Sequence, residues 1–283
     1  MIPKIFHFVF GLKPQQEPFH LVFYLCLKSC LEVNRPQRLM FHYYHEPYGE
    51  WWERIKTEIE LVKIEPVEFD ALRTRYDSRQ EGRYIKQHNL EYAHQADIVR
   101  LQALIEHGGV YADMDTLFVN PMPDHIYQNT FVMGDEGLAP ENPVPEDYRS
   151  LCNALMLSAP GAEFPQRWLE NIYAVFDGSW SRHSNQEASM LALNHPESIT
   201  IIPKQHFYRF SCTPDGLREL FGELHTNLEQ VYSMHLWAHL WWEPQRIDFT
   251  RFHNGLITPE FLRDYDSTYN VLARKYLDAS ERS

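Results

Sequence analysis

The chain has 283 residues, of which 44% are hydrophobic, so it can bury one large core or a core with a small helical annex. Its formal net charge of -13 argues against a broad nucleic-acid-binding surface, because such surfaces are built from clustered Lys and Arg. The four cysteines are too sparse for a disulfide framework and favour a reducing cytoplasm. No apolar run approaches the ~18 residues needed to cross a bilayer, so we expect at most peripheral contact with the inner face of a membrane.

The first part of the chain predicts an alternating β/α pattern. Runs of β-branched and aromatic residues at 5–10 and 39–44 are typical of strands, and the segment 19–33 between them predicts a helix. The N-terminus lacks the charged start, long apolar run and cleavage site of a secretory signal, so 5–10 is interpreted as the first strand. Another strand is expected at 61–67, followed at 70–83 by a polar segment typical of a loop or short helices.

The segment 86–121 is the most informative part of the sequence. A helix of about 3.6 residues per turn places six of its residues on one broad face: Leu90, Ala93, Asp97, Arg100, Leu101 and Leu104. A carboxylate and a guanidinium among apolar neighbours are costly unless they pair with each other or point into a cleft. Spacing alone leaves both interpretations open. Gly108 and Gly109 then supply the left-handed conformation that ends a helix.

Residues 110–115 predict a strand whose two-residue period sends Asp113 and Asp115 to the same side. Two neighbouring carboxylates repel each other unless a hard cation such as Mg²⁺ or Mn²⁺ lies between them and the oxygens of a diphosphate. An Asp-x-Asp triplet alone is a weak signal, because it occurs by chance in solvated loops. The preceding helix, the glycine pair and the apolar strand strengthen the prediction of a cation site.

Other segments carry weaker patterns. The Trp-rich clusters at 51–52 and 237–242 are more typical of core packing than of sugar platforms. Asn153 and the segment 185–187, at an expected junction between a loop and a helix, are as typical of caps and turns as of sugar contacts. The stretch 135–147 is rich in Pro and Glu and predicts a flexible loop beside the site.

Together these motifs resemble the Asp-x-Asp glycosyltransferases, which include yeast-type initiating mannosyltransferases, bacterial capsular sugar transferases and the large clostridial glucosylating toxins. The resemblance rests on residues 2–11, 96–101 and 108–115, with weaker similarity at 153–161 and 235–241. It implies a GT-A fold, a Rossmann-like α/β/α sandwich with a mixed central sheet and additional helices. It also implies an enzyme, a hexosyltransferase that retains the anomeric configuration of the sugar.

The resemblance further implies a single glycosyltransferase domain over 1–283. Residues 1–121 would form the nucleotide-sugar-binding half, while 122–283 would supply the acceptor side and a C-terminal metal-ligand segment. The expected donor is a nucleotide sugar, with a UDP-sugar favoured over a GDP-sugar, and the expected cofactor is Mn²⁺ or Mg²⁺. The acceptor would be a glycan or a lipid-linked sugar, as in polysaccharide biosynthesis.

The same resemblance assigns roles to individual residues. It implies Asp97, Arg100, Asp113 and Asp115 as the catalytic set. Phe10 takes the position of a Trp that stacks on the nucleobase in related enzymes, and it keeps an aromatic face without the indole donor. The implied donor-binding set is Phe8, Val9, Phe10, Asp97, Arg100, Asp113, Asn153 and Trp241.

The metal ligands implied by the resemblance are Asp113, Asp115 and His235. His235 belongs to a late His-x-Trp element similar to the metal-binding histidine of several retaining transferases, and neutral imidazole suits Mn²⁺. His239 is a rival, since residues four positions apart on a strand point the same way. An alternative in which both histidines only pack a C-terminal strand beside their Trp neighbours also stays open.

Two other functions remain open on the sequence. The segment 113–116 superficially matches the nucleophile and acid/base pair of haloacid-dehalogenase-type Mg²⁺-dependent phosphatases. That motif normally lies on the first strand, and a Lys separates it from a later acidic pair, whereas the later pair here, Asp135 and Glu136, has no such Lys before it. The second alternative is a catalytically silent carbohydrate-binding protein on the transferase fold.

Overall fold

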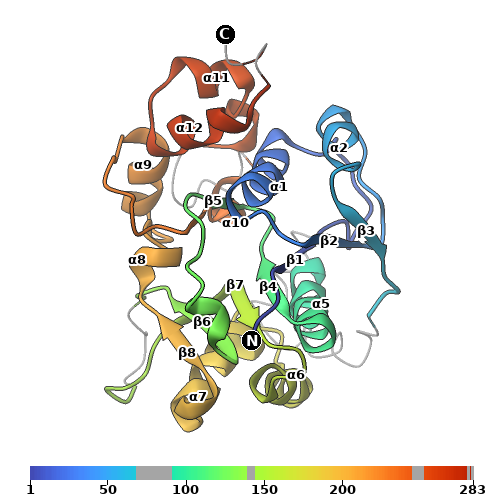
Figure 1. Ribbon diagram of the computed structural model, residues 1–283, viewed down its shortest axis with the longest axis vertical. Helices are drawn as coiled ribbons and strands as arrows, with labels where there is room; N and C mark the ends of the chain where they lie inside the picture. Colours follow the sequence, from blue (N-terminus) through green and yellow to red (C-terminus); the bar gives the residue numbers. More distant parts are fainter. Residues whose placement is uncertain (68–90, 139–143, 244–251, 279–280, 282–283) are drawn as a thin grey trace.

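The computed structural model describes five parts of the chain: residues 1–67, 91–138, 144–243, 252–278 and 281. At its centre is a seven-stranded mixed sheet with the strand order β3-β2-β1-β4-β7-β6-β8. Helices cover both faces of the sheet, and short helices gather at the end of the molecule where the C-terminus lies (Figure 1). The α/β/α sandwich with a mixed sheet and additional helices, which the resemblance to GT-A enzymes implied, is confirmed.

The first four strands are β1 (Ile5–Val9), β2 (Arg38–Tyr43), β3 (Glu60–Lys63) and β4 (Gly109–Ala112). They run parallel, with β1 between β2 and β4, and with β3 at the edge beside β2. Parallel neighbours need crossover connections, and helix α1 (Leu21–Asn34) supplies the one between β1 and β2. Helix α5 (Glu91–His107) leads directly into β4.

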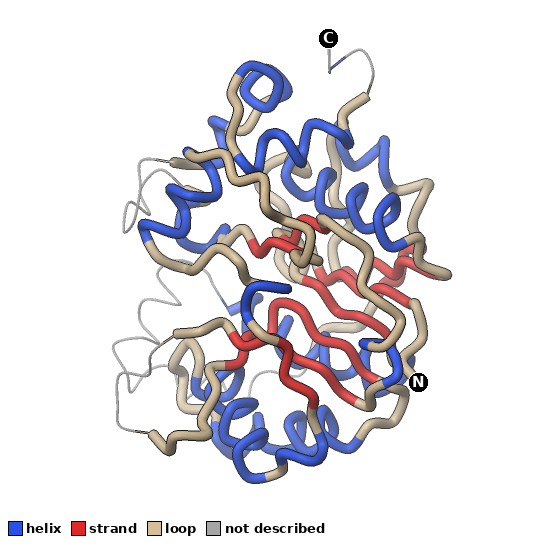
Figure 2. Tube along the Cα trace, turned by 60° about the vertical axis from the view of Figure 1, so that its left-hand side comes forward, coloured by secondary structure: helices blue, strands red, loops and turns tan. Residues whose placement is uncertain are grey.

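The remaining strands of the large sheet are β6 (Phe131–Asp135), β7 (Leu151–Ser158) and β8 (Thr200–Ile202). Strand β7 runs antiparallel to both β4 and β6, and β8 runs parallel to β6. Helices α6 (Glu163–Val175) and α7 (Glu187–Asn194) pack together with α5 on one face (Figure 2).

Alternate side chains of the central strands enter two separate cores. Phe6 and Phe8 of β1 and Val110 of β4 pack with α1 on one face of the sheet. Val9 of β1 and Tyr111 of β4 pack with α5 on the other face. This alternation follows from the two-residue period of a strand, and it explains why these strands are almost continuously apolar.

A second sheet, of two strands, joins distant parts of the chain. Strand β5 (Thr116–Phe118) pairs antiparallel with β9 (Ser233–His235), so that Thr116 lies opposite His235. In the described parts of the chain, the other α-helices are α2 (Glu50–Ile55), α8 (Lys204–Phe207), α9 (Pro214–Gly222), α10 (Ala238–Trp241), α11 (Pro259–Asp264) and α12 (Thr268–Ala273). Single turns occur at η2 (Ile126–Gln128), η3 (Arg182–Gln186), η4 (Pro196–Ser198), η5 (Asn254–Leu256) and η6 (Arg274–Tyr276).

The elements predicted for the first half of the chain are confirmed to within two residues for the strands at 5–10 and 39–44 and the helix at 19–33. The strand predicted at 61–67 ends at Lys63, and Pro66, which has no N–H to donate, follows three residues later. The segment predicted as loop or short helices at 70–83 lies outside the described residues.

Several further predictions can be compared with the fold. Trp52 and Trp241 are fully buried, which confirms core packing for both Trp-rich clusters. All four cysteines are free thiols. Among the described residues, no helix combines the length and apolar content needed to span a membrane. Part of the predicted loop at 135–147 is irregular, but residues 139–143 lie outside the described part of the chain.

The two glycines after α5 adopt the left-handed conformation predicted for them. The φ angle is +62° at Gly108 and +105° at Gly109. A Cβ atom on Gly109 would lie only 2.2 Å from the carbonyl oxygen of Ile5, because β4 pairs with β1 at this point. Gly161 also has a positive φ, of +66°, but no atom lies within 4 Å of the position of its Cβ.

We therefore predict that Gly109→Ala lowers the free energy of unfolding by at least about 3 kcal/mol, because it adds a clash between strands to the cost of a left-handed Ala. Gly161→Ala is the matched control and should lose only about 1 kcal/mol, the backbone cost alone. Urea unfolding of both variants measures the difference. Equal losses in the two variants would show that the clash with Ile5 does not affect the free energy of unfolding.

Candidate functional site

The two aspartates of the Asp-x-Asp triplet lie in a turn, which corrects the prediction of a strand over 110–115. Strand β4 ends at Ala112, and the Thr116 amide donates to the Asp113 carbonyl at 3.0 Å to close the turn. The Asp113 amide still bonds to β7, through Ala154, whereas the Asp115 carbonyl accepts from Leu236 just after β9. The backbone thus passes from the large sheet to the small one within this triplet, so the strand period does not orient the aspartates.

Asp113, Asp115 and His235 nevertheless converge. One ligand atom from each lies within 4.8 Å of the others. The His235 Nε2 atom is 3.1 Å from Asp115 Oδ1 and 3.7 Å from Asp113 Oδ2. The register of β5 against β9 fixes this approach, because Thr116 is paired with His235. The second oxygen of Asp115 accepts a hydrogen bond of 2.7 Å from the Ala238 amide, which holds the carboxylate in one orientation.

His239 does not belong to this group of converging ligands. Strand β9 ends at His235, and the left-handed conformation of Trp237, with φ of +56°, turns the chain into helix α10. His239 lies on that helix with an exposed side chain. The expectation that a continuous strand points both histidines the same way is therefore wrong. Among the described residues, the converging group contains His235 and not His239.

Opposite charges determine the protonation of this group. Burial opposes charge on Asp115, but His235 and the Ala238 amide outweigh it and lower the pKa of Asp115 to about 2. Burial, together with the neighbouring Asp115, raises the pKa of Asp113 against the opposing effect of Arg100. The pKa of His235 is raised, because the two aspartates outweigh the effect of burial. The two aspartates thus favour a proton on His235.

Arg100 connects this group to a second set of predicted residues. Its Nη1 atom lies 3.2 Å from Asp113 Oδ1, and its Nη2 atom lies 3.4 Å from Asp97 Oδ1. It also donates to the carbonyl of Asn153 on β7 at 2.9 Å. The ion pair between Asp97 and Arg100 within the helix is therefore present. It is one part of a network that joins α5, β7 and the turn after β4. The Asn153 side chain completes the network by donating to Asp97 Oδ1 at 2.8 Å.

The network is almost closed to solvent. Asp97 and Arg100 are 7% and 6% exposed. Burial would lower the pKa of Arg100, but Asp113, Tyr111 and Asp97 raise it, so the guanidinium stays charged. Burial likewise opposes charge on Asp97, but Arg100 and His183 hold its pKa well below the usual range. Each buried charge thus has an opposite charge beside it, as the cost of burying an ion requires.

The remaining residues of the predicted donor-binding set lie apart from this network. Phe10 is half-buried and packs against Phe19 and Phe23, with ring centroids 5.3 and 4.8 Å away. Phe8 and Trp241 have no exposed surface, so their rings have no face left for a ligand and serve the core. Val9 is 8% exposed and packs in the core on the side of α5.

The sequence analysis missed Tyr111, which lies beside the site. The Tyr111 hydroxyl donates to Asp113 Oδ1 at 2.6 Å, and the Arg100 guanidinium lies 4.5 Å from the centre of its ring. No pattern in the sequence indicated this contact, because β4 ends at Ala112 and Asp113 lies in the turn that follows. Asn185 accepts from the Asn153 amide at 3.1 Å, and helix α7 begins at Glu187, as the junction predicted at 185–187 requires.

Glu136 is a second residue whose burial had no signal in the sequence. It follows β6, is 6% exposed and accepts a hydrogen bond of 2.9 Å from the Ser150 hydroxyl. Burial is the main cause that raises its pKa to about 7, although Ser150, Cys152 and His235 act in the opposite direction. This carboxyl group therefore titrates near neutral pH, and a distant charge on His235 influences it.

Comparisons with known proteins bear on the whole chain. Residues 33–132 match a family described as "Glycosyltransferase sugar-binding region containing DXD motif". The chain is 28% identical over 287 residues to "Glucan organizing enzyme 1" of Cryptococcus neoformans var. grubii serotype A, covering 98% of this chain and 71% of the relative. A solved structure, "PaToxG Glycosyltransferase", aligns with 69% of this chain and 70% of its own, at a TM-score of 0.42 and 14% identity.

The region that matches the family begins just before β2 and ends within β6. It contains Asp97, Arg100 and the turn after β4, and Asp113 and Asp115 form its Asp-x-Asp triplet. The match favours a transferase fold over the phosphatase. Residues 33–132 therefore correspond to the DXD-containing sugar-binding region of glycosyltransferases.

Proposed function

We propose that this enzyme is a metal-dependent, retaining hexosyltransferase that takes its sugar from a nucleotide-sugar donor, with a UDP-sugar preferred. The observation that carries the proposal is the convergence of Asp113, Asp115 and His235 beside Arg100. Two acidic side chains from the region that matches the family meet the imidazole of His235, which lies outside that region. A fixed cationic side chain lies on their other side.

The converging side chains suit a divalent cation. Two carboxylate oxygens and one imidazole nitrogen are acceptable ligands for Mn²⁺, and Mg²⁺ also accepts the carboxylates. The neighbouring Asp115 helps to raise the pKa of Asp113, so a cation between the two carboxylates would relieve their repulsion. When bound, the cation would neutralise charge on the diphosphate of the donor. Asp113, Asp115 and His235 would hold it.

Arg100 and Asp97 supply the second half of the proposed mechanism. Arg100 is held by Asp97, Asp113 and the Asn153 carbonyl, so its charge is oriented before a donor arrives. A preorganised charge costs no reorganisation during reaction, which makes it effective at stabilising charge that develops on the departing phosphate. Asp97 and Asn153 would contact the sugar. Because Arg100 would hold sugar and phosphate together, transfer with retention requires no conventional protein nucleophile.

In this proposal, the two halves of the chain bind different substrates. Residues 1–121 would bind the nucleotide sugar. The Phe10 ring would stack on the nucleobase, and the backbone at Val9 would lie beside the same base. Residues 122–283 would supply the acceptor side and the metal ligand His235, so that the whole of 1–283 acts as one glycosyltransferase domain. Glu136 lies on the proposed acceptor side.

The acceptor in this proposal is a glycan or a lipid-linked sugar. The name of the relative from Cryptococcus, a glucan organizing enzyme, supports a role in polysaccharide biosynthesis. We place the reaction in the cytoplasm, with at most peripheral contact with the inner face of a membrane. The four free thiols are consistent with a reducing compartment.

The first prediction from the proposed function concerns Asp115→Asn. This change should lower turnover at least about 100-fold and weaken Mn²⁺-dependent donor binding, because one charged ligand is lost. Release of free nucleotide diphosphate from UDP-glucose, UDP-galactose, UDP-N-acetylglucosamine and GDP-mannose measures the activity. Circular dichroism should show an intact fold. Asp215→Asn is the matched control, since the Asp215 side chain is 74% exposed and should not affect turnover. Unchanged activity of Asp115→Asn would remove the proposal.

The second prediction concerns Phe10→Ala, which should weaken donor binding by about 1 to 3 kcal/mol, the scale of one lost aromatic stack on a base. Calorimetric titration with the nucleotide diphosphate measures the change. Phe23→Ala removes a neighbouring half-buried ring, which stacks on Trp242, and serves as the control for lost packing. If Phe10 is only structural, both variants will melt at a lower temperature and bind the donor normally.

The third prediction concerns the dependence of stability on pH. The pKa of Glu136 is about 7 in the folded chain, above its ordinary value of 4.5, so the folded state keeps a proton that the unfolded state releases between these values. The free energy of unfolding should therefore fall by roughly 3 kcal/mol as the pH rises from about 4.5 to 7. Glu136→Gln should lack this contribution. Urea unfolding of both proteins at pH 5 and pH 7, in EDTA, tests it, and parallel changes would contradict it.

A further inference from the structure

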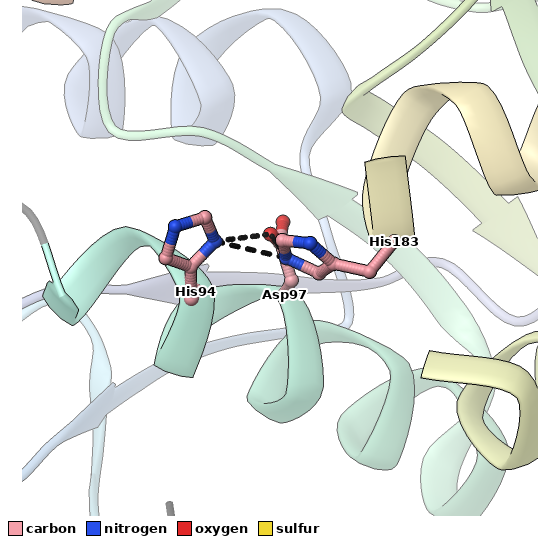
Figure 3. A group of neighbouring side chains, drawn as sticks. All are labelled: His94, Asp97 and His183. Carbon is pink, nitrogen blue, oxygen red and sulfur yellow. Dashed lines mark hydrogen bonds and ion pairs between the residues drawn. The ribbon is translucent and has the colours of Figure 1, made fainter. Parts of the chain in front are cut away.

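Three side chains that could bind a metal ion lie close together: His94, Asp97 and His183 (Figure 3). His94 and Asp97 project from neighbouring turns of α5, and His183 faces them from the single turn η3. All three residues are buried, with exposures of 1%, 7% and 0%. The cluster is separate from the group formed by Asp113, Asp115 and His235, and neither His94 nor His183 is used in the proposed transfer.

The ligand atoms have the spacing of a small coordination site. His183 Nε2 lies 2.9 Å from His94 Nδ1 and 3.1 Å from Asp97 Oδ2, and the third edge, from His94 Nδ1 to Asp97 Oδ2, is 3.9 Å. Zinc binds nitrogen and oxygen ligands at about 2.0 to 2.2 Å, which places tetrahedral ligand atoms roughly 3.3 Å apart. Two of the observed separations, 2.9 and 3.1 Å, are shorter than this value, and the third, 3.9 Å, is longer.

Hydrogen bonds alone account poorly for these contacts. The Nε2 atom of His183 has a proton or a lone pair, but not both, and it lies within hydrogen-bonding distance of both the His94 ring and Asp97. One proton would have to be shared between an imidazole nitrogen and a carboxylate oxygen. A cation at the centre of the triangle would instead accept a lone pair from each of the three atoms.

The surroundings hold the three side chains in place. The Phe176 ring lies 4.7 Å from the His183 ring and 5.5 Å from the His94 ring, measured between centroids. The Trp168 indole donates to the His183 carbonyl at 3.0 Å, which fixes the backbone of η3. Asp97 is fixed from its other oxygen, Oδ1, by Asn153 and Arg100. Only small movements are therefore needed to bring the ligand atoms around an ion.

We propose that His94, Asp97 and His183 form a second metal site, which binds Zn²⁺ or a similar divalent transition metal. Two imidazoles and one carboxylate are a common ligand set for zinc, whereas Asp113 and Asp115 offer mainly oxygen, which harder cations prefer. The Oδ2 atom of Asp97 would bind the metal, while Oδ1 keeps its contacts with Asn153 and Arg100. A metal here would therefore fix the position of Asp97 beside the proposed sugar site.

The test uses the full chain with the first cation site removed by Asp115→Asn and His235→Gln. The protein is stripped with EDTA, mixed with excess Zn²⁺ and desalted, and its zinc is measured by mass spectrometry. We expect about one zinc per chain, and none after His183→Gln is added. The matched control is His42→Gln in the same background, because the His42 ring lies 3.0 Å from a nitrogen of the buried His7 without a carboxylate in the pair. This control should keep its zinc.

A second measurement depends on geometry rather than on stoichiometry. Co²⁺ added to the same background should give the intense visible absorption of four- or five-coordinate cobalt with imidazole ligands, and His183→Gln should lose it. The proposal is overturned if the background chain retains no zinc after desalting, or if zinc and the cobalt absorption persist in His183→Gln. These outcomes leave the proposal for Asp113, Asp115 and His235 untouched, because that site is absent from every chain in the test.

Discussion

The buried charge of Arg100 is the constraint around which the centre of the molecule is arranged. A guanidinium that is 6% exposed must have carboxylates beside it, because an unpaired buried ion costs several kcal/mol. Asp97 and Asp113 meet this need from two different elements. Arg100 therefore fixes the position of α5 relative to the turn after β4. Because its charge must be balanced, the acidic triplet lies beside the Arg100 guanidinium.

The same balance governs the other aspartate. Asp115 has no contact with Arg100 and depends on His235 and the Ala238 amide, both from the distant end of the chain. The site thus has two halves. The local half is Arg100 with Asp97 and Asp113, and it depends on helix α5. The long-range half is Asp115 with His235, and it depends on the pairing of β5 with β9. The charge of Arg100 is permanent, whereas that of His235 depends on its proton. The proposed metal ion would therefore replace the counter-charge of the second half and not that of Arg100.

The local half could be predicted from the residue pattern, whereas His235 of the long-range half was predicted only through the resemblance to a family. The period of α5 placed Asp97 and Arg100 on its buried face, and the strands at 5–10 and 39–44 followed from their apolar runs. The turn at Asp113 to Asp115 was missed because it arises where the chain leaves one sheet for another, and the partner strand β9 is more than a hundred residues away. His183 and Glu136 are buried by contacts between distant elements, so no periodic pattern marks them.

The pairing of β5 with β9 also has a consequence for the order in which the enzyme is built. A ribosome delivers the acidic triplet long before it delivers His235, and chains fold from their N-terminal parts first. Until the later segment emerges, β5 has no partner strand and Asp115 has no positive neighbour. Loop closure over this distance is slow compared with the formation of a helix such as α5. Asp113, Asp115 and His235 can therefore come together only after the segment that contains β9 has been synthesised.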